Sequence, residues 1–323
     1  MFGSHLSIAG GLENALIRAD ELGMDCVQVF TKNQRQWSAP ALSDEQVERW
    51  FAQRRAGRVD RVVSHDSYLI NLASPQREVR EKSIRLFVDE VERCERLDIA
   101  HLVTHPGSHT GIGEARGLDR VARALDRVHK RTAGYRTVTC LEVTAGQGTG
   151  LGYRFEHLRQ IIDAVAEPRR LAVCLDTAHM LAAGYDLTSG AGAAATLEQI
   201  DQTLGLDLVK VVHVNDSKVE RGRRVDRHAH IGQGFVSLEA FAVMCKRFAA
   251  VPKILETPKE DHERTGEAWD AINLRKLRGL VGEKGRRAKR GKASKRGKAT
   301  SSGKARGGGA SKGRSTRSGK GGG

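Results

Sequence analysis

Aspartate, glutamate and histidine side chains recur in this 323-residue chain at positions where several of them could hold a metal ion. In the stretch VDRHAHIGQG, residues 225–234, Asp226 and His228 are two residues apart, and His230 follows. Two side chains at this spacing on an extended segment project to the same side. Taken alone, a polar stretch beside glycine is more often a solvated turn. Its meaning therefore depends on candidate ligands elsewhere.

The ends of the expected strands supply such candidates. Short apolar, β-branched runs predict strands at residues 2–5, 26–31, 61–65, 101–105, 137–142, 171–176, 208–213 and 252–256. The last residues of the final six are His65, His105, Glu142, Asp176, His213 and Glu256. Carboxylates gathered without a counter-charge resist ionisation, so a divalent metal cluster explains these strand ends better than a polar rim does.

His179 follows Asp176 by three residues, within the loop that we expect after the sixth strand. With it, the candidate ligands comprise five histidines, two aspartates and two glutamates. Imidazole and carboxylate ligands without thiolate suit zinc, manganese or iron. Such a set exceeds what one zinc ion takes and suits three ions, above all if a carboxylate bridges two of them.

Eight strand–helix repeats must position these residues. Helical patterns lie near residues 10–23, 43–57, 76–98, 114–131, 155–166, 193–204, 237–249 and 266–279. Repeats of this size over residues 1–280 predict an α/β fold, a (β/α)8 TIM barrel, in which the C-terminal strand ends converge on one face. An open doubly wound sheet is the alternative, but no Gly-x-Gly-x-x-Gly fingerprint follows the first strand.

Charge divides the chain near residue 280. Residues 281–323 hold 15 of the 54 Lys and Arg but one of the 39 Asp and Glu, which leaves residues 1–280 with a net charge of +1. The segment 281–323 has almost no apolar residue larger than alanine, and we expect it to be a disordered tail. Its composition favours sequence-independent contact with nucleic-acid phosphates. A solvated linker and an anionic membrane surface are the alternatives.

The five cysteines are isolated in the sequence, and none forms a Cys-x-x-Cys pair. Cys26, Cys140 and Cys174 lie in apolar runs that are typical of buried free thiols. Neither a signal peptide nor a membrane span is evident. We therefore expect a reducing, cytoplasmic compartment and no membrane partner. A monomer is a separate expectation.

Nine short stretches together resemble endonuclease IV, the zinc-dependent apurinic/apyrimidinic endonuclease family of base excision repair. In order, they are GSHLSIAGG (3–11), FTKNQRQW (30–37), HDSYLINLASP (65–75), HPGSH (105–109), EVTAGQG (142–148), DTAHMLAAGYD (176–186), HVNDSK (213–218), RVDRHAHIGQG (224–234) and ILET (254–257). The resemblance implies three zinc ions per chain, with manganese as an alternative at one or more positions. The implied ligands are His65, His105 and Glu142 for the first ion; Glu142, Asp176, His213 and Glu256 for the second; and His179, Asp226 and His228 for the third. His230 falls outside this set, as a residue behind the ligands or on the surface.

The reaction implied by the resemblance is hydrolysis of double-stranded DNA on the 5′ side of an abasic nucleotide, which leaves a 3′ hydroxyl and a 5′ deoxyribose phosphate. Metal ions bridged by Glu142 would activate water and stabilise the leaving oxygen, and Glu256 would orient the attacking water. Trimming of blocked 3′ ends is expected too. With DNA as partner, we expect a nucleoid-associated enzyme whose segment 281–323 contacts DNA nonspecifically.

Arg35, Tyr68 and Leu69 match the family's residues that fill the gap and wedge the base stack. From the residues alone, packing of a loop onto a helix is the plainer interpretation of Tyr68 and Leu69. Wedging costs a few kcal/mol of unstacking, and least where a base is already absent, so it would favour damaged sites.

Val143 and Ala178 depart from the family's pattern, which usually has asparagine and cysteine there. Val143 could alter the hydrogen bonds around the metal ligands. Two other functions compete with DNA repair. A sugar isomerase or epimerase on a related barrel would need fewer metals and no Asp226–His228 pair. An architectural DNA-binding protein would rely on the basic segment and need no intact ligand set.

Overall fold

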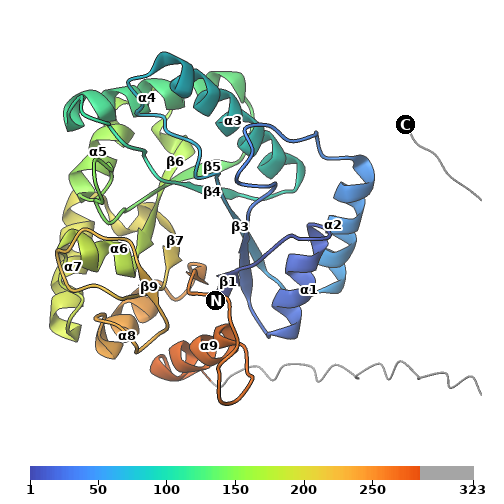
Figure 1. Ribbon diagram of the computed structural model, residues 1–323, viewed down its shortest axis with the longest axis vertical. Coiled ribbons are helices and arrows are strands. Elements are labelled where there is room, and N and C mark those ends of the chain that lie inside the picture. Colours follow the sequence, from blue (N-terminus) through green and yellow to red (C-terminus); the bar gives the residue numbers. More distant parts are fainter. Residues whose placement is uncertain (284–323) are drawn as a thin grey trace, which may run out of the picture. The chain divides into compact units, whose positions relative to one another are not determined.

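The computed structural model describes residues 1–283, which form a closed barrel of eight parallel strands (Figure 1). Around the barrel the order is β1, β2, β3, β4, β5, β6, β7 and β10, and β10 closes the ring by pairing with β1. The strands are β1 Phe2–His5, β2 Cys26–Val29, β3 Arg61–His65, β4 His101–Thr104, β5 Val138–Glu142, β6 Leu171–Asp176, β7 Val209–His213 and β10 Lys253–Leu255. The predicted TIM barrel is confirmed.

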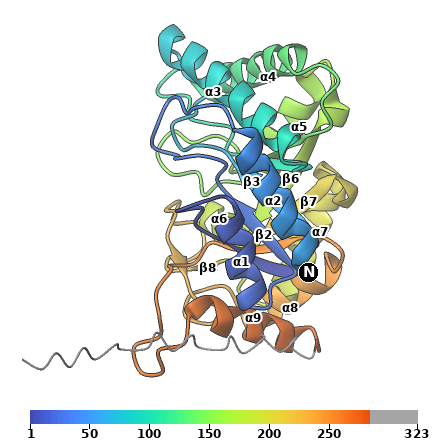
Figure 2. The same ribbon diagram turned by 90° about the vertical axis from the view of Figure 1, so that its right-hand side faces the viewer.

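Helices surround the strands, as two views of the ribbon show (Figures 1 and 2). They are α1 Glu13–Glu21, α2 Asp44–Ala56, α3 Arg77–Arg96, α4 Glu114–Arg131, α5 Phe155–Ala164, α6 Thr177–Ala183, α7 Gly190–Thr203, α8 Leu238–Arg247 and α9 Trp269–Leu280. Short 3₁₀ helices precede β6 and β7, at Pro168–Arg170 and Leu206–Leu208. A two-stranded ribbon, β8 Asp216–Ser217 with β9 His228–Ala229, lies in the connection after β7.

Helix α6 corrects one expectation, because His179 lies in this helix and not in a loop. Asp176, the last residue of β6, is the N-cap of α6, and its Oδ1 accepts a hydrogen bond from the backbone N–H of His179 at 2.8 Å. A capping carboxylate satisfies one of the free donors of the first helical turn. The Asp-x-x-His spacing thus begins a helix directly at the strand end.

Two strands end one residue earlier than predicted. β4 ends at Thr104 and β10 at Leu255, so His105 and Glu256 directly follow their strands. His65, Glu142, Asp176 and His213 are the last residues of β3, β5, β6 and β7. Since parallel strands point the same way, these residues gather at one end of the barrel.

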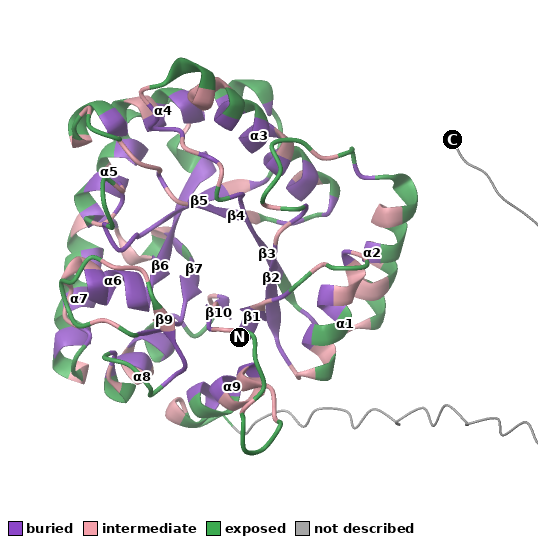
Figure 3. Cartoon of the chain, viewed as in Figure 1, coloured by how far each residue is buried: buried purple, intermediate pink, exposed green. Residues whose placement is uncertain are grey.

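Apolar side chains fill both the barrel interior and the layer beneath the helices. The interior cluster comprises Cys26, Val63, Val103, Cys140, Ala172, Cys174, Val211 and Ile254. Figure 3 shows buried strands and helices that are buried on the side facing the barrel and exposed outward. All five cysteines are buried and free, as predicted for the three within strands. Each large apolar side chain buried here stabilises the fold by about 1.5–3 kcal/mol, so the strand ends rest on a rigid base.

Residues 284–323 lie outside the described part of the chain, and with them nearly all of the segment predicted to be a disordered, DNA-contacting tail. Within residues 1–283, no helix combines the length and apolar character needed to cross a membrane.

Candidate metal centre

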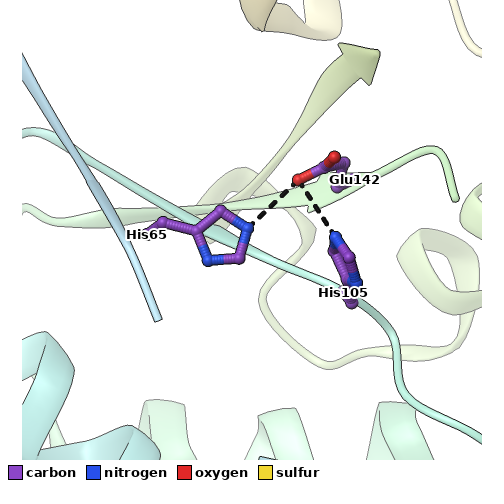
Figure 4. Close-up of side chains that lie close together, drawn as sticks. All are labelled: His65, His105 and Glu142. Carbon is purple, nitrogen blue, oxygen red and sulfur yellow. Dashed lines mark hydrogen bonds and ion pairs between the residues drawn. The ribbon is translucent and has the colours of Figure 1, made fainter. Parts of the chain in front are cut away.

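The first group of candidate ligands joins strands β3, β4 and β5 at their C-terminal ends. His65 Nε2 lies 3.2 Å and His105 Nε2 lies 3.5 Å from the same Glu142 oxygen, Oε2 (Figure 4). Glu142 is fully buried, whereas His105 is partly exposed. The three ligand atoms are close enough to share one metal ion.

The second group includes Glu142 again and is more deeply buried. His213 Nδ1 lies 3.1 Å from Glu256 Oε2, 3.3 Å from Glu142 Oε1 and 3.7 Å from Asp176 Oδ2. The sulfur of Cys174 is also near Glu142 and His213. Burial raises the pKa of the Cys174 thiol to about 12, so that residue stays a neutral core side chain.

The third group lies where helix α6 meets the segment before β9. Asp226 Oδ2 is 3.2 Å from His179 Nε2, and Asp226 Oδ1 is 3.4 Å from His228 Nε2. Within residues 1–283, both of these buried Nε2 atoms lack a hydrogen bond of good geometry. A buried polar atom without a partner is costly, and a metal ion coordinated by both imidazoles would supply one. The residues therefore fit a metal.

All nine predicted ligands meet at one face of the barrel, in groups that overlap. Glu142 belongs to the first and second groups, as the sequence-based assignment had it. The structure also brings Asp176 within ligand distance of His179 and His228, with Asp176 Oδ2 3.8 Å from His228 Nε2. Asp176 thus lies between the second and third groups, a position that the sequence-based grouping did not include.

Imidazoles keep the carboxylates of these groups ionised. Burial would raise the pKa of Glu142, but the charges of His213 and His105 hold it well below its usual range. Burial likewise opposes the ionisation of Asp226, yet its close contact with the charged ring of His179 lowers its pKa to about 2. Burial would lower the pKa of His65, but its contact with Glu142 raises it to about 9. Metal ions can take over the charge-balancing role of these protons.

Backbone carbonyls orient three of the candidate histidines. The distances from Nδ1 to carbonyl oxygen are 2.9 Å for His65 to Asp66, 3.1 Å for His179 to Val143 and 3.2 Å for His228 to Glu256. A carbonyl only accepts, so Nδ1 keeps its proton, and Nε2 is the nitrogen that would offer its lone pair to a metal ion. Because any residue supplies a carbonyl, valine at position 143 keeps this contact.

The segment that carries Asp226 and His228 is tied down at several points. The Asp216 carboxylate accepts hydrogen bonds of 2.9–3.1 Å from the backbone N–H groups of Gly232, Gln233, Gly234 and Val236. A Cβ on Gly234 would lie 2.2 Å from the Ser217 carbonyl oxygen, so only glycine fits there. Asp226 N–H donates to Gln147 Oε1 at 3.0 Å. The glycines beside the two ligands thus permit close packing and not merely a turn.

The residues predicted to contact DNA are placed differently from one another. Tyr68 is 68% exposed, and its ring lies 5.5 Å from Phe30 and 6.0 Å from His65, measured between centroids. It borders two hollows of about 520 and 960 Å³ that both reach Asp226. Arg35 is exposed and Leu69 is half-buried, and neither lines these hollows. Only Tyr68 of the three adjoins the candidate ligands directly.

Other residues near the ligands were not anticipated in detail. Gln28 contacts His213 and Glu256, and Gln147 holds the backbone of Asp226. The signal for Gln28 was a lone polar residue in the apolar run CVQV. His230 is buried, not on the surface, and stacks on Trp269 with ring centroids 4.0 Å apart, away from the three groups.

Solved structures first confirm the barrel. A D-tagatose 3-epimerase-like protein superposes with a TM-score of 0.66 at 20% identity, over 87% of this chain and 97% of that one. At this identity the likeness concerns the fold alone. Endonuclease IV from Thermus thermophilus superposes with a TM-score of 0.74 at 37% identity, over 87% of this chain and 98% of that one.

Sequence comparisons identify the family. Residues 16–278 match the model of the xylose isomerase-like TIM barrel family. "Probable endonuclease 4" of Chloroflexus aurantiacus is 49% identical over 282 residues, which cover 87% of this chain and 98% of that protein. The relative of the same name from Geotalea daltonii is 46% identical over 284 residues, 87% of this chain and 98% of that one. The resemblance predicted from the sequence and the enzyme class that it implies are confirmed: the chain belongs to the endonuclease 4 family of xylose isomerase-like TIM barrels.

Proposed function

We propose that this chain cleaves double-stranded DNA on the 5′ side of abasic nucleotides with a centre of three zinc ions, and that it trims blocked 3′ ends at the same site. The observation that carries the proposal is the set of three overlapping ligand groups, joined through Glu142 and Asp176 at the C-terminal face of the barrel. Membership of the endonuclease 4 family supports the DNA substrate.

The assignment of residues to ions follows the overlap. His65 and His105 would hold one ion with Glu142; Asp176, His213 and Glu256 would hold the second with Glu142; and His179, Asp226 and His228 would hold the third. A donor set of five imidazoles and four carboxylates suits zinc, with manganese as an alternative at one or more positions. Bound zinc would supply the positive charge that an anionic phosphodiester requires and make water nucleophilic near neutral pH.

Glu142 and Glu256 differ in the part that each can take in catalysis. Glu142 is fully buried and ionised, so it fixes the spacing of the first two ligand groups. Glu256 is 15% exposed in its side chain and lines the larger hollow, where it can accept a hydrogen bond from an incoming water. We therefore assign Glu142 to bridging and Glu256 to orientation of the nucleophile.

Recognition of the missing base is assigned to Tyr68, Arg35 and Leu69. The exposed ring of Tyr68 stands over the hollow that reaches His65 and Asp226, where it can stack in the space of an absent base. Arg35 lies on the exposed loop after β2 and can contact the opposite strand. The unstacking cost of a few kcal/mol is least at a lesion, which favours damaged sites. We propose a monomeric, nucleoid-associated, cytoplasmic enzyme.

Incision of an oligonucleotide duplex with one central abasic analogue, without added metal, tests this function. We expect cleavage 5′ of the lesion, no cleavage of the intact duplex, and loss of cleavage in Asp226→Ala. Asp261→Ala, an exposed aspartate outside the ligand groups, is the matched control and should cut normally. Metal analysis should find close to three ions per chain, and close to two in Asp226→Ala.

An inactive wild-type protein with fewer than two bound ions would contradict the proposal and favour a sugar isomerase or epimerase. Such an enzyme has no need for the third ligand group. Cleavage of intact duplex at the same rate would contradict the assignment of the lesion as substrate.

A further inference from the structure

Gln28 is a buried amide placed between two candidate metal ligands. It lies in β2, Cys26–Val29, with no exposed surface. Its Nε2 donates to Glu256 Oε1 at 2.6 Å, and its Oε1 lies 2.9 Å from His213 Nε2. His5 Nδ1 lies 3.0 Å from the same amide nitrogen. A side chain from β2 thus connects the ligand at the end of β7 with the ligand that follows β10.

The hydrogen bonds of Gln28 determine which nitrogen of His213 carries the proton. An ionised carboxylate only accepts, so the amide NH2 must face Glu256 and the amide oxygen must face His213. The oxygen cannot donate, hence His213 Nε2 keeps its hydrogen, and Nδ1 is the nitrogen that would offer its lone pair once a metal ion takes the place of the second proton. That Nδ1 is the atom that faces the carboxylates of Glu142, Asp176 and Glu256.

His213 differs in this respect from the other oriented histidines. His65, His179 and His228 are held through Nδ1 by backbone carbonyls, which no substitution of the accepting residue removes. His213 would hold a metal ion through the opposite nitrogen, and its orientation depends on a side chain. One substitution can therefore remove a hydrogen bond from His213 and from Glu256 together.

We propose that Gln28 is a positioning residue for the second metal ion, which fixes the tautomer of His213 and the orientation of Glu256. This inference rests on the proposed function, since it presumes that the second ligand group holds a metal. Groups that orient metal ligands in this way typically contribute 10–100-fold to metal affinity. Gln28 itself coordinates nothing.

Gln28→Met tests the proposal because methionine keeps the volume and removes both hydrogen bonds. We expect the zinc-loaded variant to release one of its ions to a chelator about 10- to 100-fold faster than the wild type. We also expect nitrogen NMR to show His213 partly in the other tautomer. Gln53→Met is the matched control, because Gln53 contacts the Asp20 carboxylate far from the ligands. It should leave both readouts unchanged.

Gln28→Glu distinguishes the effect of the hydrogen bond to His213 from that of the hydrogen bond to Glu256. It also provides a second test if the methionine variant fails to fold. The new carboxylate keeps an acceptor for His213 but repels Glu256, so zinc release should accelerate while the tautomer is retained. Unchanged zinc release and an unchanged tautomer in a folded Gln28→Met would overturn the positioning role. Absence of bound metal in the wild type would instead overturn the metal centre, so the two failures are distinguishable.

Discussion

Glu142 is a fully buried carboxylate that is surrounded by histidine side chains. Its two oxygens lie within 3.5 Å of nitrogens of four histidines, His65, His105, His179 and His213. A fully buried carboxylate is tolerated only with opposite charge or metal beside it. The same surroundings that make a buried Glu142 compatible with the fold also place it between two ligand groups.

His129 shows the opposite case, a buried imidazole with no partner. It lies in α4, and both ring nitrogens lack hydrogen bonds within residues 1–283. Burial lowers its pKa to about 4, with the charge of Arg170 as a further cause. The unfolded chain, with a histidine pKa near 6.5, therefore takes up a proton first as the pH falls. Stability contributed by neutral His129 is intact above pH 6.5 and is lost progressively down to about pH 4.

Replacing His129 by leucine should remove this acid sensitivity. Between pH 7 and pH 5 we expect His129→Leu to lose about 1 kcal/mol less unfolding free energy than the wild type does. Urea unfolding of both proteins at both pH values measures the difference, and any loss of metal at pH 5 affects both alike. Equal losses of unfolding free energy in the two proteins would show that His129 is protonated as readily in the folded as in the unfolded chain.

At the scale of elements, helix α3 holds the loop between β2 and α2 that carries Arg35. Lys32 Nζ and Glu90 Oε1 form a 3.0 Å ion pair in which each side chain is 2% exposed. Arg93, one turn along α3, reaches the carbonyl oxygens of Thr31 and Pro40 at the two ends of the loop. The loop is thus fixed by contacts with helix α3.

Glu90→Gln should leave the buried Lys32 charge without its counter-charge. Breaking one partner of a buried pair costs about 3–5 kcal/mol, whereas an apolar replacement of both is nearly neutral. We therefore expect Glu90→Gln to be strongly destabilised in urea. The double variant Lys32→Met with Glu90→Leu should recover stability. Its KM for abasic duplex should still be higher than that of the wild type, because the loop that carries Arg35 has lost its ion pair with helix α3. A double variant with wild-type KM would show that the pair supports the fold alone.

At the scale of the whole chain, charge and fold are separated along the sequence. Residues 1–280 carry a net charge of +1, and residues 281–323 carry nearly all of the positive excess. Each phosphate neutralised by Lys or Arg releases counterions and steepens the salt dependence of binding. We therefore propose that the basic segment increases affinity for DNA of any sequence.

Deleting residues 281–323 should weaken binding to intact duplex and flatten its dependence on salt. Incision of the abasic duplex at low salt should change little, because the candidate ligands all lie within residues 1–283. Fluorescence anisotropy across a salt series, with and without the segment, measures both effects. Equal slopes for the two proteins would rule out a role for the segment in DNA affinity.

Periodicity and residue type in the sequence were enough to predict the barrel and the candidate ligands. Strands that end in His, Asp or Glu must bring those residues to one face, because all the strands of such a barrel run parallel. His65, Glu142, Asp176 and His213 illustrate this, since each is the last residue of its strand. Family resemblance supplied the grouping into three ions, which spacing alone left open.

Other features depended on contacts between segments far apart in the chain. Asp176 caps α6 and lies between two ligand groups, a position that follows from how β6 leads into the helix. Gln28 reaches His213 across 185 residues, and no local pattern encodes which strand faces which across a barrel. Periodicity reports which side of a strand is buried, whereas the partner on that side is determined only when the barrel closes.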